Sequence, residues 1–543
     1  MSGAISVPRR FTQLFDTPNS LAGHALKVAR VNAAENSLEF APINISPFAW
    51  AADWVNVLDY NAAGVITTTT LAAQLNSGST SATLTDASSY AIGHGMAIPG
   101  AGAAGAELAV TLTSVVGNVV SWSGATSTTV AIGTTVHHDD TQAFLDAIDT
   151  AKHVYAPWGN YNVTDTLTLD TYAGQCLMGG GDEKTRIYHR SLTKDCIVLV
   201  KVGTSLRRLM VIMDASLTPT SGAGVVVGKV GSSASVRTYV NEVSIVNTYD
   251  GLRTENTTSS SIYKVVIADP RRYGWYSTSG TPTGGCEYSD IIIYLGSPSW
   301  RAGVVAGFYM DKGDTTRYNN ISFFGFPKNA WIRSTAGPVS TQIFTGFTNE
   351  SGAGTSDYSI YLEKGAYDIT AVCFTGGEVL LGNIYVGAGV EDTNLVGITI
   401  PCYPVGSSGV HIYGKKTKLL GIHVGSTGNS TNSYDGIKVY SGADGTQIIG
   451  CAAKKRRYGL TVENGAFNTI IQGNNFLDNN TAAYSFGSTV RENSRISGNF
   501  GIEDYGTSIA STPGYVGQEA LSGGHFYKAV GTSSSADWKQ ITA

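Results

Sequence analysis

The chain has 543 residues, of which 14% are charged and 65 are glycine, and its formal net charge at pH 7 is −5. So few charges and so much glycine exclude a helical bundle, a coiled coil and a charged disordered chain. The charge balance also disfavours a dedicated nucleic-acid or anionic-membrane binder. Hydrophobic residues make up 42% of the chain, which is enough to bury a large core.

Neither a membrane span nor a secretory signal is visible in the sequence. No stretch approaches the ~18 consecutive apolar residues of a membrane helix. Residues 1–15 lack the apolar core of a signal peptide. We therefore expect a protein that is made in the cytoplasm of the producing cell, without a signal peptide, and that does not insert into a membrane.

The first quarter of the chain divides into small parts. Residues 1–48 are expected to form a separate N-terminal segment, and residues 49–64 to supply a first strand of the main domain, around Asp53–Tyr60. Residues 65–136 are dense in Thr, Ser, Gly and Val and predict an inserted small β module. Its strands are expected near Ser81–Leu84, Leu108–Val116 and Val119–Trp122, the last two joined by a turn at Gly117-Asn118.

One helix is predicted, over Asp140–Ala151. Asp139 or Asp140 can cap its first turn, and an apolar stripe follows one of its faces: Ala143, Phe144, Ala147 and Ile148. Because an open end of a sheet structure needs a cover, we expect this helix to close the start of the domain that follows.

From about Tyr239 onward, short Val/Ile/Phe/Thr segments alternate with Gly, Asn or Asp breaks. The unit recurs at intervals of roughly 20 to 30 residues, which indicates stacked repeats. Leucine-rich repeats would need a Leu-x-x-Leu-x-Leu spacing that is not present. We predict an all-β chain in which residues 137–504 form a parallel β-helix, with strands paired from coil to coil at ~4.8 Å, and residues 505–543 form a small C-terminal β module.

Several segments resemble the opening of pectate-lyase-like β-helices in bacteriophage tailspikes. They are Val55–Tyr60, Asp139–Ile148, Pro157–Tyr161, Leu167–Leu169 and Gly179–Gly181. The two ends of the chain also resemble phage tail proteins. The segments concerned are Phe11–Ser20 with Lys27–Phe40, and Tyr515–Gln518 with Phe526–Ile541.

This resemblance implies a right-handed, single-stranded β-helix in a homotrimeric tailspike of the virion. The N-terminus would attach to a phage tail or baseplate protein. The β-helix would bind, and usually cleave, a bacterial surface polysaccharide: a capsule, an O-antigen or an exopolysaccharide. A virion protein leaves its host by lysis, so it can act at the host cell surface although it carries no export sequence.

Hydrolysis of a glycosidic bond needs two carboxyl groups on either side of the bond. Aligning the repeats on their first strands places Glu350 and Glu378 at matching turns of adjacent coils, so these two glutamates are the predicted catalytic pair of an endo-acting glycoside hydrolase. Further residues are predicted to bind substrate, because aromatic rings suit the apolar faces of sugars and arginine suits hydroxyl and carboxylate groups. They are Asp269, Arg271, Arg272, Tyr273, Trp275 and Trp331.

Alternatives stay open at this point. Both glutamates could be solvated turn residues, and other acids remain candidates: Asp290, Asp311, Asp314, Asp357, Glu363, Glu391 and Asp392. A lyase acting on a uronate-containing polymer would instead use basic and tyrosine side chains, for which the chain offers Arg271, Arg272, Tyr273, His411, Tyr413 and His423. A receptor-binding fibre without enzymatic activity is the third possibility.

No metal and no cofactor are expected. The six cysteines never occur as Cys-x-x-Cys, and the consecutive residues His137–Asp140 cannot all point at one ion. The glycines at 179–181 are not followed by the Gly-Lys-Ser/Thr of a phosphate-binding loop.

Overall fold

A computed structural model describes residues 27–31, 38–42, 54–66, 68–229, 235–278, 285–296, 303–350, 358–401, 407–425, 434–488, 490, 494–499, 512–513, 516, 519–522 and 525–541. The chain forms two compact units, Met1–Trp54 and Val55–Ala543. In the first unit, β1 (Lys27–Val31) pairs antiparallel with β2 (Leu38–Pro42). The remaining residues of the predicted 1–48 segment lie outside the described residues, as do Asp357 and most of residues 491–518.

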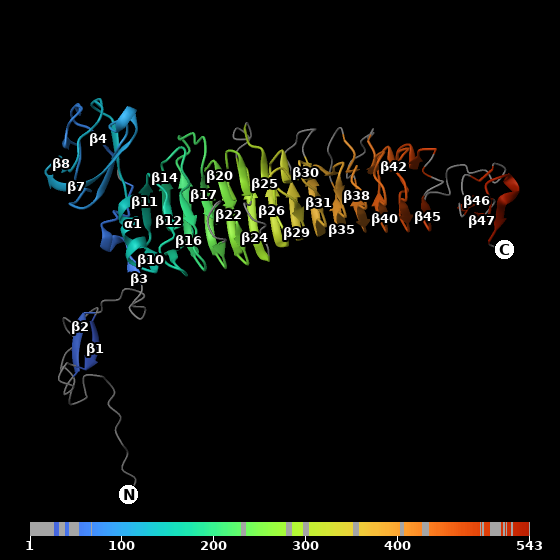
Figure 1. The fold of residues 1–543 in the computed structure, drawn as a ribbon, viewed down its shortest axis with the longest axis horizontal. Helices are drawn as coiled ribbons and strands as arrows, with labels where there is room; N and C mark the ends of the chain where they lie inside the picture. Colours follow the sequence, from blue (N-terminus) through green and yellow to red (C-terminus); the bar gives the residue numbers. More distant parts are fainter. Residues whose placement is uncertain are drawn as a thin grey trace, which may run out of the picture. The chain divides into compact units, whose positions relative to one another are not determined.

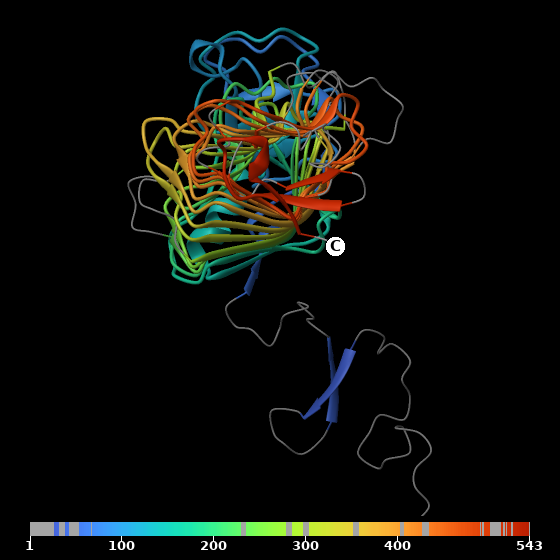
Figure 2. The same cartoon turned by 90° about the vertical axis from the view of Figure 1, so that its right-hand side faces the viewer.

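The second unit is dominated by two long parallel sheets, and the predicted parallel β-helix is confirmed (Figure 1). Viewed along the stack, the strands of successive coils lie over one another (Figure 2). That the coil is right-handed stays a prediction.

Among the described residues, the longer sheet has 19 strands: β3 (Trp54–Asn56), β10 (His153–Ala156), β11 (Gly159–Val163), β13 (Cys176–Gly179), β14 (Thr185–His189), β16 (Ser205–Met213), β19 (Tyr239–Val246), β22 (Ser261–Ala268), β24 (Cys286–Tyr294), β26 (Thr316–Phe324), β29 (Gln342–Glu350), β32 (Cys373–Leu381), β35 (Asn394–Ile400), β37 (Lys418–Leu420), β38 (His423–Val424), β40 (Gln447–Ile449), β41 (Ala452–Ala453), β43 (Ile470–Gln472) and β45 (Arg495–Ser497).

The second sheet has 13 strands: β12 (Leu167–Leu169), β15 (Ile197–Leu199), β17 (Ala223–Val227), β20 (Asp250–Thr254), β23 (Tyr273–Ser277), β25 (Ala306–Met310), β27 (Lys328–Arg333), β30 (Tyr358–Glu363), β33 (Asn383–Val386), β36 (Val410–Ile412), β39 (Ile437–Val439), β42 (Tyr458–Val462) and β44 (Ala482–Phe486). Two short parallel ladders complete the coils: β28 (Val339–Ser340), β31 (Ile369–Thr370) and β34 (Val390–Glu391), and β18 (Ser235–Val236) with β21 (Thr257–Thr258).

One corner of the coil is formed by residues in the left-handed conformation. Each of these residues interrupts the strand pairing of its coil in the longer sheet at an equivalent position, with φ between 52° and 64°. They are Arg208, Glu242, Lys264, Asp290, Asn320, Gly346, Gly376, Gly397, Gly421, Gly450, Gly473 and Gly498. Side chains strain this conformation and glycine does not. The change to glycine in the later coils therefore explains much of the glycine-rich rhythm of the sequence.

The interior of the coil is filled by columns of like side chains. In the middle coils the column is aromatic: the rings of Tyr318 and Phe344 stack at 4.2 Å, and those of Phe344 and Phe374 stack at 4.4 Å. All three side chains are almost completely buried. A buried ring removes a large apolar area from water, so this continuous dry column is the main source of stability for the middle coils.

The predicted helix is confirmed as α1 (Thr141–Thr150), which lies at the end of the stack where the coil begins (Figure 1). Its predicted apolar stripe is buried in the core. Asp139 accepts a hydrogen bond from the backbone N of Thr141 at 3.1 Å. The Asp140 carboxylate makes no cap and instead accepts from the backbone N atoms of Ala63 and Asn162, at 2.5 and 3.0 Å. It thereby ties the segment before the inserted module to the first coil.

The inserted module is a six-stranded antiparallel sheet with its own core. Its strands are β4 (Thr68–Thr70), β5 (Ser81–Thr83), β6 (Gly95–Ile98), β7 (Leu108–Val116), β8 (Val119–Trp122) and β9 (Thr135–His138). Because β9 ends immediately before Asp139, the module runs directly into α1. Near the C-terminus, β46 (Glu519–Ser522), β47 (His525–Ala529) and β48 (Trp538–Gln540) form a three-stranded antiparallel sheet.

A buried ion pair fixes one corner of the coil, and it occurs twice with the same sequence. Tyr-Asp-Gly on one coil is followed by Arg-Arg-Tyr-Gly on the next, at residues 249–251 with 271–274 and at residues 434–436 with 456–459. Arg272 donates from Nε and Nη2 to the two carboxylate oxygens of Asp250, at 2.9 and 2.5 Å. Arg457 binds Asp435 in the same way, at 2.9 and 3.0 Å. Both aspartate side chains are completely buried.

The Arg457–Asp435 pair predicts a large loss of stability on Arg457→Gln, because the buried carboxylate of Asp435 would lose both of its charge-assisted hydrogen bonds. We expect the free energy of unfolding, measured by denaturant titration, to fall by about 3 kcal/mol. Lys455→Gln is the matched control. It removes the same charge two residues away, where the exposed Lys455–Asp478 pair should contribute less than about 1 kcal/mol. Equal losses in the two variants would contradict this account of the corner.

Candidate functional site

Five aromatic residues stand in register on the outer side of the 13-stranded sheet. They are Tyr276, Tyr309, Trp331, Tyr361 and Tyr385, one from each of five successive coils, and we call them the aromatic ladder. The residues that follow them along the strands face the core, since side chains alternate along a strand. A single outward position repeated from coil to coil therefore builds a continuous aromatic surface.

The rings of the ladder lie close to one another. Their centroids are 4.9 Å apart between Tyr309 and Trp331, 6.0 Å between Trp331 and Tyr361, and 4.7 Å between Tyr361 and Tyr385. Tyr309 is only 7% exposed, whereas Trp331, Tyr361 and Tyr385 are half-buried. The Nζ of Lys328 lies 4.1 Å from the centroid of the Trp331 ring. Three neighbouring coils thus each leave part of an aromatic side chain exposed to solvent.

Charged residues stand beside the ladder, two positions further along the same strands. Arg333 and Glu363 are register partners, and their side chains form an ion pair at 3.5 Å. Asp311 directly follows Met310. The register partner of Met310 is Ile332, which directly precedes Arg333. Asp311, Arg333 and Glu363 therefore occupy corresponding positions on three successive coils, and we call these three residues the charged column. Arg333 is ion-paired with Glu363, whereas Asp311 bonds to Tyr276 and Thr278 of the preceding coil.

Asp311 is the buried member of the charged column, at 6% exposure. Its Oδ2 accepts a hydrogen bond from the Tyr276 hydroxyl at 2.8 Å. Burial raises the pKa of the Asp311 carboxyl, and hydrogen bonds from Tyr276 and Thr278 oppose the rise without cancelling it. Glu363 is the second carboxyl group of the charged column, two coils away from Asp311. Because burial favours the protonated form of Asp311, one carboxyl group can donate a proton while the other accepts one.

The ladder and the charged column suit a carbohydrate chain. Aromatic faces pack on the apolar faces of sugar rings. The Cα atoms of Asp311 and Glu363 are about 10 Å apart, since each coil adds about 4.8 Å. Carboxyl groups separated by about 6.5 to 9.5 Å leave room for a sugar and a water molecule, as inverting hydrolysis requires.

The predicted catalytic glutamates lie on the other long sheet. Glu350 ends β29 and is half-buried, and Glu378 is an exposed residue of β32. Glu378 is the register partner of Thr348, and Glu350 is paired with Leu381 after a bulge. The two glutamates thus lie on neighbouring strands, but they do not occupy the equivalent positions that the sequence alignment of the repeats assumed.

The prediction that Trp275 binds substrate is wrong. Its side chain is completely buried in the core, and its Nε1 donates to Thr254 Oγ1 at 3.1 Å. Strand alternation is the physical reason, because Trp275 faces inward and its neighbour Tyr276 faces outward. The aromatic residue in the outward position is Tyr276, one residue further on.

The other predicted binding residues cluster at the corner that leads into β23. Both carboxylate-binding donors of Arg272 are taken up by Asp250, so Arg272 holds the corner together. Tyr273 is half-buried and stacks on Tyr309 of the ladder at 4.7 Å. Asp269 accepts from the backbone N of Gly296 at 2.6 Å, and Arg271 donates to the carbonyl oxygen of Ala215 at 3.3 Å. Of the predicted set, Trp331 and Tyr273 reach the aromatic surface.

Four members of the ladder were missed, although a sequence signal for them exists. An aromatic residue flanked on both sides by core residues recurs in successive coils: Trp275-Tyr276-Ser277, Phe308-Tyr309-Met310, Ala330-Trp331-Ile332, Ile360-Tyr361-Leu362 and Ile384-Tyr385-Val386. When an aromatic residue recurs at the outward position of successive strands, the pattern indicates an aromatic surface and not part of the core.

No group of three His, Cys, Asp or Glu side chains in the described part of the chain is placed to hold a metal ion. Within the same residues, no helix has the length and apolar character needed to cross a membrane.

Comparisons with known proteins found likeness only among solved structures. No family model matches the chain, and no curated protein matches it. The Dettilon tailspike protein is 13% identical, over 66% of this chain and 67% of that one, with a TM-score of 0.46. The tailspike protein of E. coli bacteriophage HK620, solved with a pentasaccharide, is 11% identical over 66% of this chain and 75% of that one, with a TM-score of 0.45.

A third solved structure is an enzyme domain. The A-module of the mannuronan C-5 epimerase AlgE6 from Azotobacter vinelandii is 15% identical, over 66% of this chain and 94% of that one, with a TM-score of 0.41. At these values the likeness carries no argument about function.

The raised pKa of Asp311 predicts how Asp311→Asn changes stability with pH. A buried acid with a raised folded-state pKa destabilises the fold at pH values above that pKa, and the penalty disappears below the unfolded value of about 4. The free energy of unfolding of the variant minus that of the native protein should therefore be largest near pH 7 and should decrease as the pH falls to 4. Denaturant titrations at several pH values measure this difference, and a constant difference would show that Asp311 is not destabilised by burial.

Proposed function

We propose that this protein is a bacteriophage tailspike that binds a bacterial surface polysaccharide along the aromatic ladder and cleaves it by hydrolysis. The observation that carries the proposal is the charged column beside the ladder. In it, Asp311 and Glu363 stand two coils apart on the outer side of one sheet, with Arg333 between them.

In the proposed reaction Asp311 is the general acid. Burial favours its protonated form. In this step the Asp311 side chain turns away from Tyr276 toward the sugar and donates a proton to the glycosidic oxygen as the bond to the anomeric carbon breaks. Glu363, ion-paired with Arg333, is the general base. It accepts a proton from a water molecule whose oxygen bonds to the anomeric carbon from the opposite face. The products are a new reducing end with inverted configuration and a free hydroxyl on the leaving chain.

The aromatic ladder supplies the binding energy in this proposal. Trp331, Tyr361 and Tyr385 present their rings on adjacent coils, and the rings are already packed against one another. A rigid aromatic surface binds an extended sugar chain without first ordering its own side chains, which lowers the entropic cost of association. Lys328 and Arg333 at the edge of the ladder can bind hydroxyl or carboxylate groups of the sugars.

Glu350 and Glu378 remain the competing carboxylate pair for the same chemistry. Thr348 is the register partner of Glu378 and lies two residues before Glu350 on β29. Side chains two residues apart on a strand lie on the same face of the sheet. The side chains of Glu350 and Glu378 therefore both project from the outer face. We favour Asp311 and Glu363 because one member of that pair is buried and the other is ion-paired, whereas Glu378 is exposed.

The phage context of the proposal rests on the resemblance of both chain ends to tail proteins. We propose that the N-terminal segment attaches the protein to a phage tail or baseplate protein and that the protein acts in the virion at the host cell surface. A homotrimer is proposed on the same ground, because tailspikes of this type are trimers.

The test is a comparison of two pairs of variants on capsular and O-antigen polysaccharides from a panel of bacterial strains. Asp311→Asn and Glu363→Gln should each lower the rate at which new reducing ends appear by at least a hundredfold, with binding of the polymer retained. Glu350→Gln and Glu378→Gln, which also replace carboxylates by amides, should keep the native rate.

The opposite pattern would reject the charged column in favour of the glutamate pair. Products with an unsaturated sugar at the new end would reject hydrolysis and identify a lyase. Binding of a polymer by the native protein without any fragments would identify an adhesion protein.

A further inference from the structure

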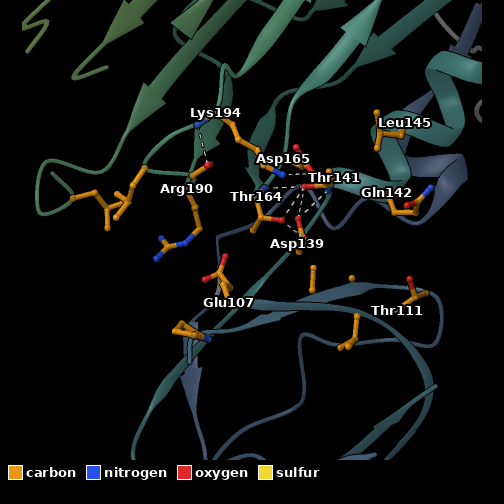
Figure 3. Close-up of a pocket in the computed structure, with 17 residues that line it drawn as sticks. Glu107, Thr111, Asp139, Thr141, Gln142, Leu145, Thr164, Asp165, Arg190 and Lys194 are labelled. Carbon is orange, nitrogen blue, oxygen red and sulfur yellow. Dashed lines mark hydrogen bonds and ion pairs between the residues drawn. The ribbon is translucent and has the colours of Figure 1, made fainter. Parts of the chain in front are cut away.

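A cavity of about 650 Å³ lies between the inserted module and the first coils of the β-helix (Figure 3). One wall comes from the inserted module, with Glu107 and Thr111 at or in β7. The other wall comes from α1 and the first coils, with Gln142, Thr164 and Arg190. The cavity lies on coils that precede all those of the aromatic ladder, so it is a separate site from the one described above.

Most charges around the cavity are already paired. Lys194 and Asp165 form an ion pair at 2.7 Å. The carboxylate of Asp139 accepts hydrogen bonds from Thr141 on one oxygen and from the Thr164 hydroxyl on the other, at 3.0 Å in the second case. Lys194 and Asp165 therefore neutralise each other, and both oxygens of Asp139 have hydrogen-bond donors.

Arg190 is the exception. Its backbone N donates to the carbonyl oxygen of Val163 and fixes the residue on the wall. Its guanidinium forms no ion pair within the described residues, and its Nε is buried without a hydrogen-bond partner. A buried guanidinium N–H that bonds to nothing is costly. A ligand cannot reach this buried Nε. The two Nη atoms of Arg190 also form no hydrogen bond within the described residues, and an acceptor in the cavity that Arg190 lines would satisfy them.

Glu107 faces Arg190 from the opposite wall (Figure 3). Desolvation at the cavity raises the pKa of Glu107, although the positive charge of Arg190 opposes the rise and the negative charge of Asp139 adds to it. The two residues form no ion pair at 4.0 Å or less. With Asp139 and Glu107 nearby, a ligand with one negative charge fits the cavity better than a phosphate with two.

We propose that this cavity binds a sugar residue that carries a carboxylate, such as a uronic acid within the polysaccharide. The planar guanidinium of Arg190 matches a carboxylate with two parallel hydrogen bonds. Thr111, Gln142 and Ser191 offer groups for sugar hydroxyls, and Leu145 and Leu217 offer apolar surface for a ring face. The site goes beyond the proposed function, since it binds a sugar without cleaving it and at a distance along the chain from the ladder.

The experiment measures binding of small sugars to the full-length protein by calorimetry or ligand-observed NMR at constant ionic strength. Sodium glucuronate and sodium galacturonate are the acidic sugars, glucose tests for the need of a carboxylate, and sodium acetate tests for the need of a sugar. We expect at least one of the acidic sugars to bind at least tenfold more tightly than both glucose and acetate. Arg190→Gln should weaken that binding at least tenfold.

Arg186→Gln is the matched control, because it removes the same charge from β14 four residues away and should leave the affinity unchanged. Thr111→Trp keeps Arg190 and fills the cavity from the inserted module, so it should also abolish binding. It keeps the test decisive if Arg190→Gln fails to fold.

Three results would overturn the proposal: acidic sugars that bind no better than glucose, acetate that binds as well as the acidic sugars, or native affinity in both Arg190→Gln and Thr111→Trp. Cleavage of the polymer is scored separately by reducing ends. A failure here therefore leaves the proposed hydrolysis at the charged column standing.

Discussion

The whole structure depends on the parallel register between coils. Each strand pairs with its equivalents one coil below and one coil above, at about 4.8 Å, so a residue type that recurs at one position becomes a column. Inside the coil such columns are apolar or aromatic and supply the stability. On the outside the same geometry builds the aromatic ladder and the charged column from residues that are far apart in the sequence. The core and the candidate site therefore both result from the same register between coils.

The corners of the coil keep this register in place. Left-handed residues at one corner turn the chain at the same point in the coils from Arg208 to Gly498, and the buried Asp250–Arg272 and Asp435–Arg457 pairs each join two successive coils. A slip of one residue would put inward side chains outside. The Arg272 pair lies at the start of β23, directly before Tyr273 and the ladder. Fixing this corner therefore fixes the aromatic surface as well.

The sequence was sufficient to predict the solenoid, the helix α1 and three of the six strands of the inserted module, because hydrophobic period and turn residues are local signals. It was not sufficient to predict which residues share a column. The separation is 33 residues from Tyr276 to Tyr309 but 22 residues from Tyr309 to Trp331, because loops of different length join the strands. The prediction that Trp275 binds substrate fails for a related reason, because the adjacent aromatic residues Trp275 and Tyr276 do not reveal by themselves which of them faces inward.

The catalytic carboxylates could not be predicted from the sequence for the same reason. Asp311 and Glu363 were both among the candidate acids, yet nothing local distinguishes them from Asp290 or Asp314. Burial of Asp311 and the ion pair of Glu363 with Arg333 arise only when three coils are stacked. Arg190 and Glu107 likewise face each other across a cavity although more than 80 residues separate them in the chain. Tertiary contacts of this kind leave no trace in hydrophobic periodicity.

The central claim is that a sugar chain lies on the aromatic ladder with its scissile bond at the charged column. A crystal or electron-microscopy structure of the Glu363→Gln protein with an oligosaccharide of its polymer tests it most directly. We predict sugar density over Trp331, Tyr361 and Tyr385, with a glycosidic oxygen within hydrogen-bond distance of the Asp311 carboxyl. Density placed only over Glu350 and Glu378, with the ladder bare, would contradict the account.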